Sequence, residues 1–147
     1  MGARWLLYFA ALAALALSPT AMNNGLALTP PRGFRSWNEF GPNISQAIMQ
    51  EVMTAMVSRK RSVNGVPTSL ADLGYTDAGV DDAWQECHAG VNGGYHRADG
   101  SPIVNTTRFP SLASMTHFAH SLNLTAGWYG NNCEVRECAA LRPGPLA

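Results

Sequence analysis

The sequence predicts an α/β fold with a parallel sheet, and three observations carry this prediction. Short apolar runs bounded by Gly and Pro alternate with longer segments in which apolar residues recur at helical spacing. The connections between the short runs are too long for hairpins, which is typical of parallel strands joined by crossovers. The 147 residues are 46% apolar and 14% charged, which is a globular composition for about one domain.

The first strand and the first helix are expected between residues 33 and 57. Gly33 to Trp37 reads as a strand, and the Gly41-Pro42 pair ends the ordered run. A helix is expected from about Ile44 to Val57, because apolar residues recur there every three to four positions. Residues 59–69 are polar and contain Gly65 and Pro67, so they are expected to form a loop.

Two more strands and one more helix follow. The second strand is expected at Tyr75–Val80 and the third at Leu124–Tyr129. Between them, Pro110 marks the start of a helix that reaches about Leu122. Residues 85–108 form a long connection of the kind that is usually functional, with a hairpin-like turn at Asp99-Gly100.

Aromatic and acidic side chains follow the expected strands. Trp37 ends the first strand, Asp81 and Asp82 follow the second, and Tyr129 ends the third. The carboxyl ends of parallel strands meet at one edge of a sheet, where ligands bind in α/β proteins. Apolar ring faces beside hydroxyl acceptors are the composition of a sugar site.

The charge balance excludes several kinds of partner. Ten Lys and Arg balance ten Asp and Glu, so the chain lacks the positive field that would hold a nucleic acid or an anionic membrane surface. The expected partner is therefore a neutral sugar. The two histidines at 117 and 120 are read as solvated, and neither a metal site nor a cofactor is expected.

The amino terminus predicts a secretory leader over residues 1–21. Arg4 precedes an apolar run that is too short for a membrane span, and cleavage fits after Ala21 or after Ala16. The mature chain is therefore expected in the secretory-pathway lumen or outside the cell, a lysosome-like compartment included, and not in a membrane. The Asn-X-Ser/Thr triplets at Asn43, Asn105 and Asn123 are candidate glycosylation sites.

The chain has three cysteines, and the expected secretory compartment is oxidising. A disulfide between Cys133 and Cys138 is expected, which leaves Cys87 over. Residues 22–138 are predicted to form the ordered domain. Residues 139–147 contain Pro and Gly without apolar periodicity and are expected to form an irregular tail.

A set of motifs resembles one family. They are Asn24 to Pro31, Gly33 to Trp37, Leu73-Gly74-Tyr75 with Asp81-Asp82-Ala83-Trp84, Phe109-Pro110-Ser111, and Gly127-Trp128-Tyr129. Their order and spacing are similar to those of alpha-galactosidases of the melibiase type, glycoside hydrolase family 27. The resemblance implies a partial (β/α)8 TIM barrel, comprising about the first three strands and two helices. It also implies a secreted hydrolase that removes terminal alpha-D-galactosyl residues by a retaining mechanism.

The resemblance assigns binding roles to four residues. Trp37 matches the tryptophan that packs on galactose, Asp81 and Asp82 match aspartates that accept bonds from its hydroxyls, and Tyr129 matches a pocket tyrosine. The family's nucleophile and its acid/base aspartate come later in the barrel, so the resemblance implies a truncated chain that has no catalytic residue and is inactive alone.

Some positions depart from the family, and other interpretations stay open. Pro42 and Ala83 stand where many members have cysteines, and Arg35 brings a charge near the pocket that a neutral sugar does not need. One alternative is a non-catalytic sugar-binding fragment, and another is a small secreted α/β protein stabilised by a disulfide. The oligomeric state is left open.

Overall fold

The computed structural model describes Gly25 and residues 28–130. The chain divides into two units, Met1–Pro30 and Pro31–Ala147. The few described residues of the first unit, Gly25 and 28–30, form no helix or strand. The expected leader and the expected tail fall outside the described residues. Among the described helices, none is both long and apolar enough to cross a membrane.

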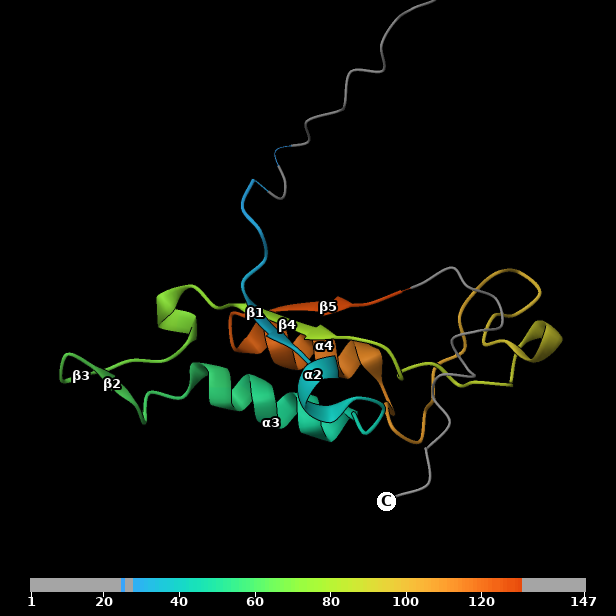
Figure 1. The fold of residues 1–147 in the computed structure, drawn as a ribbon, viewed down its shortest axis with the longest axis horizontal. Coiled ribbons are helices and arrows are strands. Elements are labelled where there is room, and N and C mark those ends of the chain that lie inside the picture. Colours follow the sequence, from blue (N-terminus) through green and yellow to red (C-terminus); the bar gives the residue numbers. More distant parts are fainter. Residues whose placement is uncertain (1–24, 26–27, 131–147) are drawn as a thin grey trace, which may run out of the picture. The chain divides into compact units, whose positions relative to one another are not determined.

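The second unit contains a three-stranded parallel sheet with helices on one side (Figure 1). The strands of the sheet are β1 Gly33–Arg35, β4 Asp77–Val80 and β5 Thr125–Trp128, in the order β1-β4-β5. The helices are α2 Trp37–Phe40, α3 Gln46–Val57 and α4 Leu112–Ser121. The predicted α/β class and the parallel pairing are confirmed.

The core lies between the sheet and the two longer helices. Alternate strand residues such as Phe34, Ala78 and Val80 face the helices, where Met49, Met53 and Met56 of α3 meet them. Phe109, Met115, Ala119 and Leu124 complete this buried cluster from the side of α4. The three methionines of α3 are therefore core residues.

Side-chain caps decide where both long helices begin. The Ser45 hydroxyl accepts a hydrogen bond from the Ile48 N–H, and the Ser111 hydroxyl accepts one from the Ser114 N–H. Each helix therefore starts one residue after its serine. This is two residues later than predicted in both cases, because apolar spacing marks the buried face of a helix and not its cap.

Residues 59–69 are not the plain loop that was predicted. They form an antiparallel hairpin of β2 Ser62–Val63 and β3 Val66–Pro67. Asn64 and Gly65 form the turn, and both have positive φ angles, of 51° and 80°. This is the dihedral pattern of the two-residue turns that Asn-Gly favours. The Asn-Gly dipeptide was the signal that pattern reasoning missed.

The second strand starts two residues later than predicted. A short 3₁₀ helix, η1 Ala71–Leu73, ends at Gly74, whose φ of 85° only glycine adopts easily. The Tyr75 N–H then bonds back to the Leu70 carbonyl, which holds Tyr75 to this turn and out of the sheet. A second 3₁₀ helix, η2 Val91–Gly93, lies in the long connection after β4.

The connection after β4 keeps part of the predicted hairpin. Isolated antiparallel bridges join His96 to Pro102 and Gln85 to Val104, with Asp99 and Gly100 at the turn. Cys87, near its start, is disulfide-bonded, so the expectation that this thiol is left over is wrong. Cys133 and Cys138 lie outside the described residues. The bond expected between them stays a prediction.

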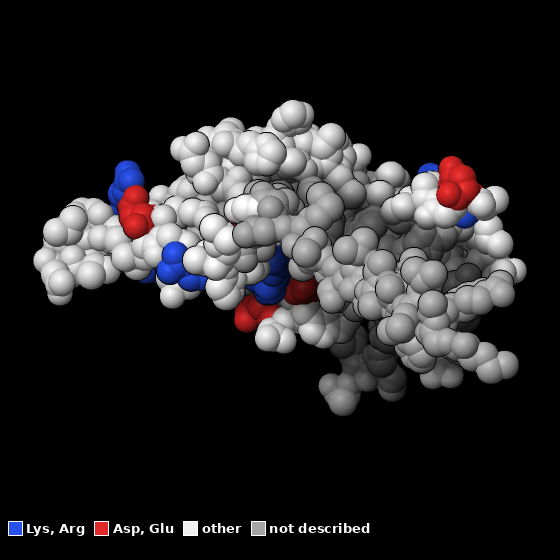
Figure 2. Space-filling view, turned by 90° about the horizontal axis from the view of Figure 1, so that it is seen from above, with Lys and Arg blue, Asp and Glu red and all other residues white. Residues whose placement is uncertain are grey.

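Charged side chains lie in small mixed groups on the surface. Figure 2 shows red and blue side chains close together over several parts of one face. Among the described residues, Arg59 forms an ion pair with Asp72, and Arg35 forms one with Asp77.

The Arg59–Asp72 pair makes stability depend on pH at the acid end. Hydrogen bonds from Arg59, with further bonds from Ser69, hold the pKa of the Asp72 carboxyl well below its usual range. The Asp72 carboxyl therefore binds a proton less readily in the folded chain than in the unfolded chain. The stability that the Arg59–Asp72 pair contributes is lost as the pH falls below about 4. In urea unfolding measured between pH 7 and pH 2.5, Asp72→Asn is expected to make the free energy of unfolding fall less steeply as the pH is lowered. A fall as steep as that of the wild type would contradict the assignment.

Candidate functional site

The structure brings the four predicted site residues to one cavity. Trp37, Asp81, Asp82 and Tyr129 line a hollow of about 330 Å³ at the carboxyl ends of the strands. Trp37 is 41% exposed and Tyr129 is 43% exposed, so both rings offer accessible surface. Asp81 and Asp82 are half-buried.

Trp37 starts a helix instead of ending a strand. β1 stops at Arg35, because Ser36 has helical dihedrals (φ −77°, ψ −24°) and α2 begins at the next residue. The Trp37 N–H donates to Asp81 Oδ2 at 2.9 Å, which ties the start of α2 to the end of β4. The Phe34 and Phe40 rings pack at 6.2 Å, so α2 folds back towards β1. The indole of Trp37, at the start of α2, is thereby placed among the residues that line the cavity.

Each aspartate has one oxygen committed to a backbone N–H. Asp81 Oδ2 accepts from Trp37, and Asp82 Oδ1 accepts from the Ala83 N–H at 2.9 Å. The remaining oxygens, Asp81 Oδ1 and Asp82 Oδ2, accept no hydrogen bond from a described residue. Each aspartate therefore brings one uncommitted acceptor to a cavity that both residues line.

Trp84 supports the cavity from beneath. Its ring is buried, and its Nε1–H donates to the Tyr129 carbonyl at 2.8 Å. The Tyr129 N–H in turn donates to the Val80 carbonyl at 2.8 Å. Trp84 is therefore part of the buried core and does not line the cavity.

Ser36 is the residue that sequence reasoning missed. It is fully buried, and its hydroxyl accepts the Asp81 N–H at 2.9 Å. A small polar residue directly before Trp37, where a strand gives way to a helix, was the available signal, since serine is common at such junctions. Ser36 makes no side-chain cap bond to α2, so its hydroxyl serves the neighbouring strand instead.

Arg35 does not bring an uncompensated charge to the cavity. Its guanidinium pairs with Asp77 at 2.9 Å and lies along the backbone of Gly79, on the sheet face that points away from the helices. Gly127 borders the same path. Arg35 does not line the cavity, so the charge expected near the pocket is balanced within the sheet.

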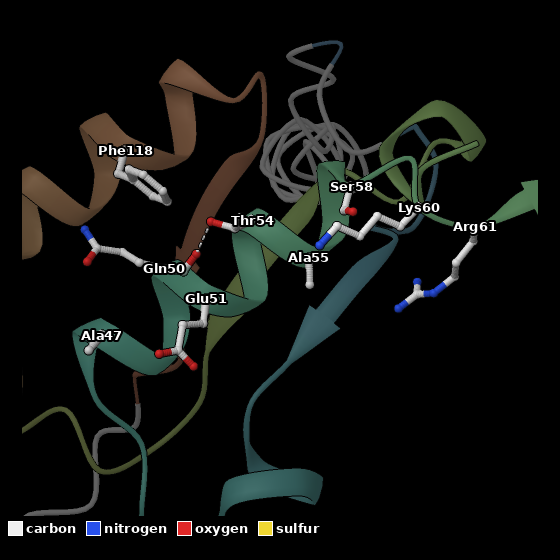
Figure 3. Close-up of a pocket in the computed structure, with 9 residues that line it drawn as sticks. All are labelled: Ala47, Gln50, Glu51, Thr54, Ala55, Ser58, Lys60, Arg61 and Phe118. Carbon is white, nitrogen blue, oxygen red and sulfur yellow. Dashed lines mark hydrogen bonds between the residues drawn. The ribbon is translucent and has the colours of Figure 1, made fainter. Parts of the chain in front are cut away.

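A second cavity of the described chain lies elsewhere and has different chemistry. It is an open groove of about 720 Å³ along the outer side of α3, bordered by Phe118 of α4 (Figure 3). Its charged side chains are Glu51, Lys60 and Arg61, and Phe118 is the one aromatic residue among its lining. This groove offers neither paired acceptors nor facing rings. The candidate site is therefore the smaller cavity lined by Trp37, Asp81, Asp82 and Tyr129, which we call the rim cavity.

No group of three or more His, Cys, Asp or Glu side chains that could hold a metal ion occurs among the described residues. His117 and His120 both lie on α4 and are exposed, as the sequence predicts for solvated histidines.

The comparisons with known proteins find alpha-galactosidases and alpha-N-acetylgalactosaminidases. An alpha-galactosidase of Cyamopsis tetragonoloba is 34% identical over 124 residues, which is 84% of this chain and 26% of that protein. A probable alpha-galactosidase of Dictyostelium discoideum is 37% identical over 120 residues, 80% of this chain and 27% of that protein. The chain is a partial relative of the alpha-galactosidases. No family model matches it.

The fold comparison gives the same result. The crystal structure of alpha-galactosidase I from Mortierella vinacea superposes with a TM-score of 0.58 at 29% identity, over 74% of this chain and 23% of that one. The family resemblance drawn from the motifs is thus confirmed. The chain spans about a quarter of the length of the alpha-galactosidases it matches.

Proposed function

We propose that this chain carries the sugar-binding rim of an alpha-galactosidase-type glycoside hydrolase and binds a terminal alpha-D-galactosyl group there. The observation that carries the proposal is the single cavity lined by Trp37, Asp81, Asp82 and Tyr129. Relatives of more than 30% identity that are named alpha-galactosidases support the choice of sugar.

The chemistry of the cavity suits a hexose. The exposed indole offers an apolar face to the C–H surface of a sugar ring, and the phenol of Tyr129 adds a second ring with a polar tip. The uncommitted oxygens of Asp81 and Asp82 accept hydrogen bonds from adjacent hydroxyl groups. A neutral ligand is favoured because Arg35, the nearest cation along β1, is already paired.

We propose further that the 147 residues bind the sugar without hydrolysing it. A retaining glycosidase needs two carboxyl groups about 5 to 5.5 Å apart on opposite sides of the scissile bond. Asp81 and Asp82 are neighbours in the chain, and each is held by a backbone N–H, which suits hydrogen-bond acceptors better than a nucleophile and an acid. The catalytic pair of a complete enzyme, with its retaining mechanism, would then come from the three quarters of the relatives that this chain does not match.

A secretory location remains part of the proposal. Asn43 and Asn123 are exposed and open to glycosylation. Asn105 is half-buried, and its side-chain oxygen accepts the Arg108 N–H at 3.0 Å, so this asparagine already has a structural role. Glycosylation at Asn43 and Asn123 is therefore expected before glycosylation at Asn105.

The proposed function predicts binding without turnover. Intrinsic tryptophan fluorescence is expected to change saturably with methyl alpha-D-galactoside, while 4-nitrophenyl alpha-D-galactoside releases no nitrophenol. Asp82→Asn removes one charged acceptor and is expected to weaken binding about 10- to 100-fold.

Asp99→Asn is the matched control for that substitution. Asp99 is an exposed aspartate in the 85–108 connection whose Oδ1 also accepts a backbone N–H, that of Ser101. Equal losses in the two variants would contradict the assigned site, and release of nitrophenol would contradict the absence of turnover.

A further inference from the structure

Ser36 lies behind the rim cavity and connects two of its lining residues. Its side chain is fully buried and does not line the cavity. We propose that Ser36 is a positioning residue of the sugar site, which fixes Asp81 relative to Trp37. The expected effect of Ser36 on sugar binding rests on the proposed function. Its expected effect on the placement of Asp81 and Trp37 does not.

Two hydrogen bonds join β4 to the start of α2. The Asp81 N–H donates to Ser36 Oγ at 2.9 Å, and the Trp37 N–H donates to Asp81 Oδ2 at 2.9 Å. Because Ser36 and Trp37 are adjacent, these bonds and the backbone close a ring. Within this ring, both the main chain and the carboxylate of Asp81 are held against the residue pair that begins α2.

The ring determines which parts of the rim remain free to bind. Asp81 Oδ2 is turned to the backbone of α2, so Oδ1 is the oxygen left for a ligand. The same bond fixes the backbone from which the Trp37 indole extends. The acceptor and the ring face are therefore set in one relative geometry before a sugar arrives, which lowers the ordering cost of binding.

Loss of the Ser36 hydroxyl would release one side of the ring. Ser36→Ala leaves the Asp81 N–H without its acceptor, and a partly buried N–H without a partner is costly. The Asp81 backbone is then expected to shift or take up water, and the Oδ2 bond to Trp37 is expected to loosen with it. Ser36 acts through Asp81 and Trp37, since it cannot reach a ligand itself.

The chain contains a matched control for this arrangement. Ser69 is also buried, and its hydroxyl accepts the Asp72 N–H at 3.0 Å. Asp72 Oδ2 in turn accepts the Ser69 N–H at 2.9 Å. The bond from a backbone N–H to a serine hydroxyl is the same, but this pair lies at the start of the short helix η1, where Asp72 also pairs with Arg59, and neither residue lines the rim cavity. Ser69→Ala therefore reports the general cost of losing such a hydroxyl.

The experiment compares Ser36→Ala, Ser69→Ala and Ser36→Thr in the full chain by ¹H–¹⁵N NMR and thermal unfolding. Without sugar, Ser36→Ala is expected to move the amide signal of Trp37, and Ser69→Ala to leave it in place. With methyl alpha-D-galactoside as the probe, Ser36→Ala is expected to weaken binding about five- to tenfold, and Ser69→Ala less than twofold. Both alanine variants are expected to lower the Tm by similar amounts.

Ser36→Thr separates positioning from folding. It keeps the hydroxyl but adds a methyl group at a fully packed position, so the Tm falls while the Trp37 signal and the sugar affinity stay near wild type. An unmoved Trp37 signal in Ser36→Ala, or equal affinity in the two alanine variants, would overturn the proposal. A moved Trp37 signal in a protein that binds no galactoside would uphold the positioning role and overturn the proposed function.

Discussion

Gly33→Ala is expected to unfold the sheet. A Cβ atom at Gly33 would overlap the backbone carbonyl of Asp77, the residue that faces it on β4. A backbone atom cannot turn aside as a side chain can, so the β1–β4 pairing must open. The expected loss is at least about 3 kcal/mol of unfolding free energy, measured by urea unfolding followed by circular dichroism.

Gly79→Ala is the matched control in the same sheet. There the new Cβ meets the guanidinium of Arg35, which is the far end of a flexible side chain. The cost is expected to be clearly smaller than at Gly33, and Arg35→Ser in the same molecule is expected to recover part of it. Equal losses at the two glycines, or no recovery in the double variant, would show that the close packing of β1 on β4 is wrongly described.

Trp37→Ala is expected to abolish most of the sugar affinity. The indole is an exposed aromatic ring that lines the rim cavity, and truncation of such an anchor typically costs about 2 kcal/mol or more. Affinity for methyl alpha-D-galactoside, measured by isothermal titration calorimetry, should fall about 30-fold or further.

Tyr75→Ala controls for the loss of an exposed aromatic ring. Tyr75 is 43% exposed, close to the 41% of Trp37, but it precedes β4 instead of following it and does not line the rim cavity. Its substitution should leave the affinity within about twofold. If Tyr75→Ala weakened binding as much as Trp37→Ala, the effect at Trp37 would not report a sugar contact.

The parts of the fold that sequence predicted are those with a repeating apolar pattern. The three strands and the two longer helices were expected in the right order and pairing, because burial against one core imposes periods of two and about 3.6 residues. The ends of these elements were less predictable. Ser45, Ser111 and Gly74 set them through single hydrogen bonds or a single φ angle, which leave no periodic trace.

The residues of the candidate site were predictable from the sequence, but the hydrogen bonds that position them were not. Trp37, Asp81, Asp82 and Tyr129 follow from strand ends that meet at one edge of a parallel sheet. That Asp81 binds the backbone of Trp37 while Ser36 binds the backbone of Asp81 depends on contacts between residues about 45 positions apart. No local pattern in the sequence encodes such contacts.

The central claim is that the rim cavity holds a galactoside and leaves it intact. A titration of the ¹⁵N-labelled 147-residue chain with methyl alpha-D-galactoside, followed by NMR on protein and sugar together, tests it most directly. We expect saturable shifts of the amide signals of Trp37, Asp81, Asp82 and Tyr129, with the glycoside signals unchanged in intensity over days. No saturable shift at these four residues, or the appearance of free galactose, would contradict it.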